Sequence, residues 1–220
     1  MIDSDSIKLR KEMVLQQIKA RNITDLRVME TMEKIPRHLF IPEANRVDAY
    51  EDKPVSIGFG QTISQPYIVA LMTEVLQLKK GEKVLEVGTG SGYQAAILAE
   101  LGAETFTIEI VPELAELGRK NLEQTRYENV NVKVGDGYLG WNEHAPFDAI
   151  LVTCAPENVP SPLVEQLKDR GRMIIPIGPE VQVQDLVLLK KVQGKLEKKS
   201  VAPVRFVPMV GEAQKLNVQK

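Results

Sequence analysis

The sequence has few of the side chains that build disulfides and metal centres, and it has no long apolar run. Its single cysteine, Cys154, cannot form an internal disulfide, and with only His38 and His144 we expect no metal site of soft ligands. No stretch approaches the roughly 18 apolar residues that a membrane span requires. The 28 basic and 30 acidic side chains leave a formal net charge of −2, which gives no field to attract nucleic acid or an anionic membrane. We therefore expect neither as a partner.

The length and composition indicate one globular domain over residues 1–220. Hydrophobic residues make up 43% of the chain and charged residues 26%, and no repeat or composition break marks a second domain. We expect residues 1–78 to carry N-terminal helices and an active-site segment, and residues 79–220 to form a cofactor-binding sheet with edge strands. The first ten residues contain acids and no apolar segment, so we expect a cytoplasmic location; we also expect a monomer.

Strands and helices alternate through the middle of the chain. Apolar periodicity predicts helices within the first forty residues, the second one capped by Thr24, and a further helix from residue 66. Helix-length segments then separate several β-rich runs, which is typical of a mostly parallel sheet covered on both faces. These runs are residues 83–87, 105–110, 130–134, 147–153 and 172–177.

The pattern changes after the last of these runs. Residues 185–192 and 200–209 are again β-rich, but only residues 193–199 lie between them. A connection this short cannot hold a crossover helix, so the two runs should form an antiparallel hairpin at the edge of the sheet.

A glycine-rich turn is the main chemical signal. The segment "VLEVGTGSGYQAAILAEL" predicts a buried strand, a tight turn with Gly88, Gly90 and Gly92, and a helix whose N-terminus faces the turn. In open α/β sheets this arrangement marks a cofactor site. Glu109 follows 21 residues after Gly88 at the end of the next strand, where its carboxylate can accept hydrogen bonds from ribose hydroxyls. Asp136, in "GDG", is placed to meet an adenine edge.

Each of these features has a plain structural reading when taken alone, as a turn, a solvated strand end or a loop. Together, at successive strand ends, they predict a nucleoside site. A dinucleotide fingerprint would need glycine where Tyr93 stands, and no glycine-lysine pair followed by serine or threonine forms a P-loop. Glu86 would repel a pyrophosphate but suits a cation. S-adenosylmethionine carries an ammonium and a sulfonium, so we favour methyl transfer over hydride transfer.

The chain resembles the protein-L-isoaspartate O-methyltransferase family over nearly its whole length. "GQTISQP", residues 60–66, is the most specific segment, because the glycine turn is shared by methyltransferases in general. The resemblance implies a class I S-adenosylmethionine-dependent methyltransferase fold, in which a doubly wound, mostly parallel sheet carries an antiparallel C-terminal hairpin and an N-terminal helical extension. It also implies methylation of the free α-carboxylate of L-isoaspartyl residues in damaged proteins and peptides. Matching segments include "IPRHLFIP", "NVKVGDGYLGW", "APFDAILVTCAP" and "VRFVPM".

The resemblance also assigns roles to single residues. Ser64 takes the place of the family's active-site serine, and two departures, Cys154 and Phe59, affect only the pocket wall. The cofactor contacts that the resemblance implies fall on Thr62, Ile63, Ser64, Glu86, Gly88, Thr89, Gly90, Glu109, Ile110, Asp136 and Gly137.

Alternatives remain at two levels. Ser64 can orient the acceptor carboxylate, or it can cap the helix that begins near Pro66. For the whole chain, the alternatives are a small-molecule or nucleic-acid methyltransferase, neither of which has a reason to carry "GQTISQP", and a silent binding module, which would be expected to lose Glu86, Glu109 or the glycines. Residues 153–156, 176–178 and 204–209 are candidate walls of a peptide groove.

Overall fold

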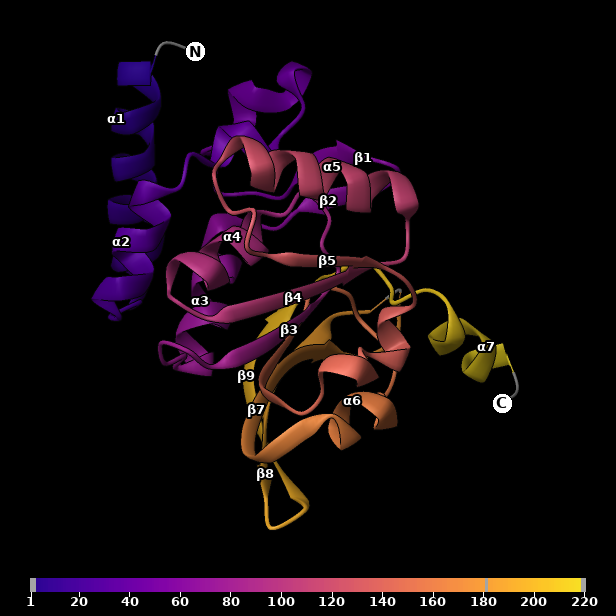
Figure 1. Ribbon diagram of the computed structural model, residues 1–220. Coiled ribbons are helices and arrows are strands. Elements are labelled where there is room, and N and C mark those ends of the chain that lie inside the picture. The colour runs from indigo at the N-terminus through magenta and orange to yellow at the C-terminus, as the bar shows by residue number, and fades with distance from the viewer. Residues whose placement is uncertain (1–2, 181, 219–220) are drawn as a thin grey trace.

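The computed structural model describes residues 3–180 and 182–218 (Figure 1). Its helices are α1 (Asp3–Met13), α2 (Leu26–Lys34), α3 (Pro66–Leu76), α4 (Tyr93–Glu100), α5 (Pro112–Gln124), α6 (Ser161–Glu165) and α7 (Glu212–Val218), with short π and 3₁₀ turns between some of them. Its strands are β1 (Val55–Gly58), β2 (Gln61–Ile63), β3 (Lys83–Val87), β4 (Glu104–Glu109), β5 (Asn131–Val134), β6 (Phe147–Val152), β7 (Leu167–Ile177), β8 (Gln184–Val192) and β9 (Lys195–Val204).

Seven strands form one sheet in the order β5-β4-β3-β6-β7-β8-β9, and β1 and β2 pair in a separate antiparallel hairpin. The strands from β5 to β7 run parallel, whereas β8 runs against both of its neighbours. The chain goes outward from β3 to β5 and then returns to place β6 on the other side of β3. This reversal puts a crevice at the carboxyl ends of β3, β4 and β6, where open α/β sheets bind ligands.

Alternate residues of the sheet supply two apolar layers. Leu85 and Val87 point to the face covered by α6, while Val84 points to the face covered by α3 and α4. Burial on both faces explains why the central strands read as nearly continuous apolar runs. The predicted doubly wound, mostly parallel sheet is confirmed.

The N-terminal helices form a third apolar cluster with α4, α5 and the β1–β2 hairpin. Figure 1 shows α1 and α2 on one side of the molecule and α7 on the opposite side. Within the described residues, none of the helices has the length and hydrophobicity that crossing a bilayer would require. The assignment of the whole chain to one domain, with a division near residue 78, stays a prediction.

Two local predictions are wrong. The segment 195–199, predicted as part of a connector, belongs to β9, and the turn before it consists of Gln193 and Gly194, both with positive φ. Its lysine-rich sequence hid the strand, because edge strands carry charges that prevent further pairing. Thr24 does not cap α2; Asp25 does, since its side chain accepts the N–H of Arg27 at 2.9 Å.

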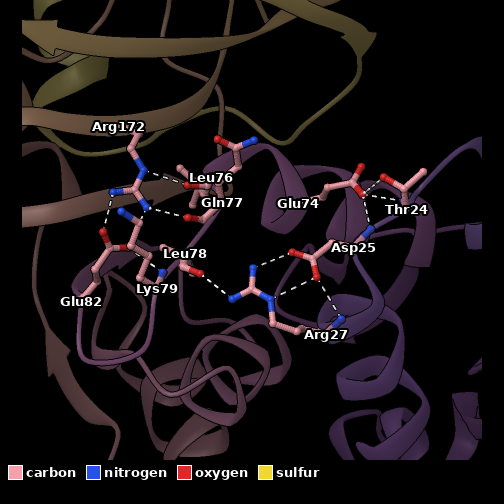
Figure 2. A network of polar contacts seen from close by, with 10 residues as sticks. All are labelled: Thr24, Asp25, Arg27, Glu74, Leu76, Gln77, Leu78, Lys79, Glu82 and Arg172. Atoms are coloured by element: carbon pink, nitrogen blue, oxygen red, sulfur yellow. Dashed lines mark hydrogen bonds and ion pairs between the residues drawn. The ribbon is translucent and has the colours of Figure 1, made fainter.

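Two arginines hold the C-terminal end of α3 (Figure 2). Arg27 of α2 donates to the carbonyl of Leu78 at 2.9 Å, and Arg172 of β7 donates to the carbonyl of Leu76 at 2.8 Å. Arg172 also pairs with Glu82 at 2.7 Å. Cations at a helix C-terminus satisfy its free carbonyls and oppose its dipole. The helix is therefore fixed to both the N-terminal extension and the sheet.

Candidate cofactor and substrate site

The glycine turn between β3 and α4 depends on three residues in the left-handed region. Gly88, Gly90 and Gly92 have φ of 99°, 50° and 86°. A Cβ on Gly88 would lie 2.1 Å from Oγ1 of Thr153, which itself donates to the carbonyl of Gly88 at 3.0 Å. Position 88 thus needs glycine both for its conformation and for its contact with Thr153, which directly follows β6.

Helix α5 supports the turn from behind, which sequence reasoning did not anticipate. A Cβ on Gly118 would lie 2.7 Å from Cγ2 of Thr89 and 3.0 Å from the carbonyl oxygen of Gly90. Asn121, one turn later, donates from Nδ2 to the carbonyl of Ser91 at 3.0 Å. The sequence carried one signal for this contact, which is the glycine itself. Glycine destabilises the interior of a helix, so its presence within a helical pattern indicates a position where a neighbouring segment packs closely.

Glu109 closes the turn from the end of β4. Its Oε2 accepts the N–H of Gly90 at 2.9 Å, and its Oε1 accepts the N–H of Val111 at 3.0 Å. The side chain is only 7% exposed but lines the pocket. Glu109 therefore joins the ends of two parallel strands at the site and is not a solvated strand end.

Glu86 lies fully buried in β3 beneath the turn. Its Oε2 accepts a hydrogen bond of 2.5 Å from Thr107, whose hydroxyl is 2.7 Å from that of Thr89. Burial raises the pKa of Glu86 to about 8; the Thr107 hydrogen bond opposes this shift and the charge of Glu109 adds to it. Its Oε1 has no hydrogen-bond partner among the described residues. A buried, unpaired carboxylate oxygen is costly, and a bound cation or donor would satisfy it.

The β1–β2 hairpin and the residues after it form the opposite wall. Gly58, Phe59 and Gly60 all have positive φ, and Phe59 is 59% exposed at the tip. Ser64 follows β2 and lines the pocket. Its hydroxyl makes no hydrogen bond within the described part of the chain, and the N-cap of α3 is Gln65, without a side-chain cap. The alternative that Ser64 caps the helix is therefore wrong.

These elements border one pocket, which is partly open to solvent. The space that the centre of a water-sized sphere can occupy in it is about 110 Å³. Every predicted cofactor contact except Asp136 lines it: Thr62, Ile63, Ser64, Glu86, Gly88, Thr89, Gly90, Glu109, Ile110 and Gly137.

Asp136 has a different set of contacts. Its Oδ1 accepts the N–H of Tyr138 at 2.9 Å, and its Oδ2 accepts the N–H of Glu212 at 2.8 Å. The carboxylate thereby caps a 3₁₀ turn and holds the first residue of α7. Its contact with an adenine edge stays a prediction.

The segment after β9 reaches back to the site. Ala155 donates to the carbonyl of Val207 at 2.8 Å and accepts the N–H of Met209 at 2.9 Å. Residues 207–210 line the pocket together with Thr153 and Cys154, whereas residues 176–178 do not. Two of the three candidate groove walls therefore border the pocket.

The chain is similar to known proteins over most of its length. Residues 8–214 match the family described as protein-L-isoaspartate(D-aspartate) O-methyltransferase. A protein-L-isoaspartate O-methyltransferase of Gloeobacter violaceus is 50% identical over 200 residues, which cover 91% of this chain and 98% of that relative. The chain belongs to this family. A second member, from Opitutus terrae, is 53% identical over 203 residues, covering 92% of this chain and 87% of its own.

A solved structure supports the same family. It comes from Plasmodium falciparum, is assigned as a protein-L-isoaspartate O-methyltransferase and was solved in complex with S-adenosyl-L-homocysteine. It is 29% identical, with a TM-score of 0.80 over 91% of this chain and 98% of that chain. The predicted family, the class I methyltransferase fold and the enzyme class are confirmed.

Among the other side chains with reactive groups, Cys154 borders the pocket and His144 does not. Burial raises the pKa of Cys154 to about 12, so its thiol is a poor nucleophile. His144 packs against Phe106 with ring centroids 4.3 Å apart. In the described ranges, no group of three or more His, Cys, Asp and Glu side chains is placed to hold a metal ion.

Proposed function

We propose that the chain repairs damaged proteins by moving a methyl group from S-adenosylmethionine to the free α-carboxylate of L-isoaspartyl residues, with Ser64 as the residue that contacts the acceptor. One observation carries this assignment of roles: the same pocket is lined by Glu86, whose buried Oε1 has no partner among the described residues, and by Ser64, whose hydroxyl makes no hydrogen bond to any of them. The first suits a cationic donor and the second an anionic acceptor.

The residues present fit the family's cofactor. S-adenosylmethionine supplies an electrophilic methyl group on sulfur. Glu86 would face its ammonium group, because Oε1 is buried and has no described partner. Glu109 would accept the ribose hydroxyls, and the backbone of Gly88 and Gly90 allows close approach because neither residue carries a Cβ. Asp136 and Gly137 would border the adenine.

The chain needs little acid or base assistance for this reaction. A carboxylate acceptor with an ordinary pKa of about 3.9 is already ionised near neutral pH. Ser64 would donate a hydrogen bond to one carboxylate oxygen and hold the other in line with the methyl carbon. Alignment of this kind can supply roughly 7–11 kcal/mol. No histidine is among the described residues that line the pocket, which fits this chemistry.

The proposal extends to the protein's surroundings. We also propose that the protein is a monomer, that it acts in the cytoplasm, and that it has neither nucleic-acid nor membrane partners. The formal net charge of −2 supports the exclusion of nucleic acid, since it provides no basic field. Sedimentation at several protein concentrations tests the monomer.

Paired peptides test the function. They differ only in L-aspartate or L-isoaspartate at one position, and the chain is incubated with each and with S-adenosylmethionine labelled in the methyl group. We expect base-labile label on the isoaspartyl peptide alone. Label on both peptides would indicate a general carboxyl methyltransferase, and label on neither would refute the proposal. A small-molecule methyltransferase would label neither peptide while still binding the cofactor.

A further inference from the structure

Arg37 is a fully buried cation directly behind the Ser64 segment. Its Nη2 donates to the carbonyl of Ser64 at 2.7 Å, and its Nε donates to the carbonyl of Ala49 at 2.8 Å. The guanidinium carbon lies 5.0 Å from the ring centroid of Tyr93, the first residue of α4 after the glycine turn. One side chain therefore contacts both walls of the pocket from the side away from solvent.

The described contacts of Arg37 are with neutral groups, two backbone carbonyls and an aromatic ring. None of the ion pairs among the described residues involves it. Burial lowers its pKa to about 10, so the guanidinium stays protonated at neutral pH. A buried cation is costly. Two of its three contacts, with Ser64 and Tyr93, are with residues that line the pocket, which indicates a role beyond packing.

We propose that Arg37 is a positioning residue for methyl transfer. By holding the Ser64 carbonyl, it fixes the orientation of the peptide plane between Ser64 and Gln65, and with it the direction of the Ser64 side chain. By lying against Tyr93, it sets this segment relative to the helix that follows the glycine turn. The inference rests on the proposed function, because it assigns Arg37 to the alignment of acceptor and donor.

Arg172 offers a matched comparison at the other end of α3. It also donates to backbone carbonyls, at 2.8 Å to Leu76 and 3.2 Å to Gln77, and it is largely buried (Figure 2). It holds the C-terminal end of α3, and the residues that it contacts there, Leu76 and Gln77, do not line the pocket, whereas Ser64 and Tyr93 do. Removal of either arginine should loosen α3, whereas only removal of Arg37 should misplace Ser64.

The test compares Arg37→Met, Arg37→Lys and Arg172→Met in the full chain. The melting temperature, the Kd for S-adenosylmethionine and the single-turnover rate with the isoaspartyl peptide are measured on each preparation, and rates are normalised to folded protein. We expect Arg37→Met to lower the rate by about 10- to 100-fold while Kd changes by less than about threefold, because small misplacements of aligned groups have effects of this size. Arg37→Lys should restore only part of the rate, since an ammonium lacks the planar fork. Arg172→Met should lower the melting temperature and leave the normalised rate nearly unchanged.

Arg37→Lys, which keeps the positive charge and most of the volume, covers the case in which Arg37→Met does not fold, and chemical rescue gives a second test. Arg37→Ala leaves a space of guanidinium shape, and millimolar guanidinium should raise its single-turnover rate without changing that of the wild type. If the wild type labels the isoaspartyl peptide and the Arg37 variants keep its normalised rate, Arg37 is only structural and the inference fails. The same conclusion follows if Arg172→Met loses as much rate as Arg37→Met. If the wild type labels neither peptide, the proposed function fails and the inference falls with it.

Discussion

Glu86 and Thr107 share a buried hydrogen bond of 2.5 Å at the floor of the candidate site, and the bond leaves Oε1 of Glu86 without a described partner. Burial raises the pKa of this carboxyl to about 8. Near neutral pH the free chain therefore holds Glu86 mostly protonated. A cationic ligand in the pocket would favour the ionised form, so ligand binding and proton release should be coupled.

We predict that S-adenosylmethionine binding at pH 6.5 releases up to one proton. At that pH the ligand's α-amino group, with an ordinary pKa of about 7.7–8.0, remains protonated and contributes little to the release. Calorimetric titration in two buffers of different ionisation enthalpy measures the protons released. Glu86→Gln should bind more weakly and release none, and a wild type that also releases none would show that Glu86 does not meet the cation.

The raised pKa of Glu86 also predicts how the stability of the protein depends on pH. Because the pKa is raised from 4.5 in the unfolded chain to about 8 in the folded chain, the folded chain binds more protons between these values. The contribution of Glu86 to the free energy of unfolding is therefore greatest below about pH 4.5 and falls as pH rises toward 8. Urea unfolding of wild type and Glu86→Gln from pH 5 to 8 measures this. The stability of Glu86→Gln should decline less across the window, and parallel curves would contradict the prediction.

Glu109→Ala should weaken cofactor binding. The carboxylate should hold the ribose by charged hydrogen bonds, each worth about 1.5–3 kcal/mol, with partial compensation by water. It also accepts the N–H of Gly90, so the glycine turn loses an anchor. Calorimetric titration gives the affinity. Glu104→Ala is the control, because Glu104 is exposed at the other end of β4. Equal affinity in both variants would remove Glu109 from the cofactor site.

Gly118→Ala should loosen the glycine turn from a distance. The new methyl group would meet the backbone carbonyl of Gly90 at 3.0 Å and Thr89 at 2.7 Å, so α5 or the turn must move. Overpacking of this kind costs about 1–3 kcal/mol. We expect lower stability and weaker S-adenosylmethionine binding than in Lys120→Ala, an exposed change in the same helix. An unchanged Kd would show that the contact does not shape the site.

Local sequence patterns predicted most of the fold and much of the candidate site. The strand before Gly88 and the helix after it, like Glu109 at the end of the next strand, are encoded by periodicity and spacing within a few residues. Those features lie at successive strand ends of a parallel sheet, and the sheet brings them together. The family resemblance added Ser64, which no spacing would have singled out.

The features that the sequence did not predict depend mostly on contacts between segments that are far apart in the chain. Arg37 reaches Ser64 across 27 positions, and Asn121 reaches Ser91 across 30, so no local pattern marks either one. Asp136 has a side chain suited both to a ligand and to capping, and only the fold shows that α7 takes one of its oxygens. The start of β9 was missed because its exposed lysines lack an apolar alternation.

The single-turnover rate of Ser64→Ala tests the central claim most directly. The hydroxyl makes no hydrogen bond within the described chain and caps no helix, so its removal should leave the melting temperature and the Kd for S-adenosylmethionine nearly unchanged. The rate of methyl transfer to the isoaspartyl peptide, with cofactor and peptide both saturating, should fall, because the lost contact is to the acceptor in the transition state. A rate equal to that of the wild type would contradict the account and leave methyl transfer dependent on the cofactor side of the pocket alone.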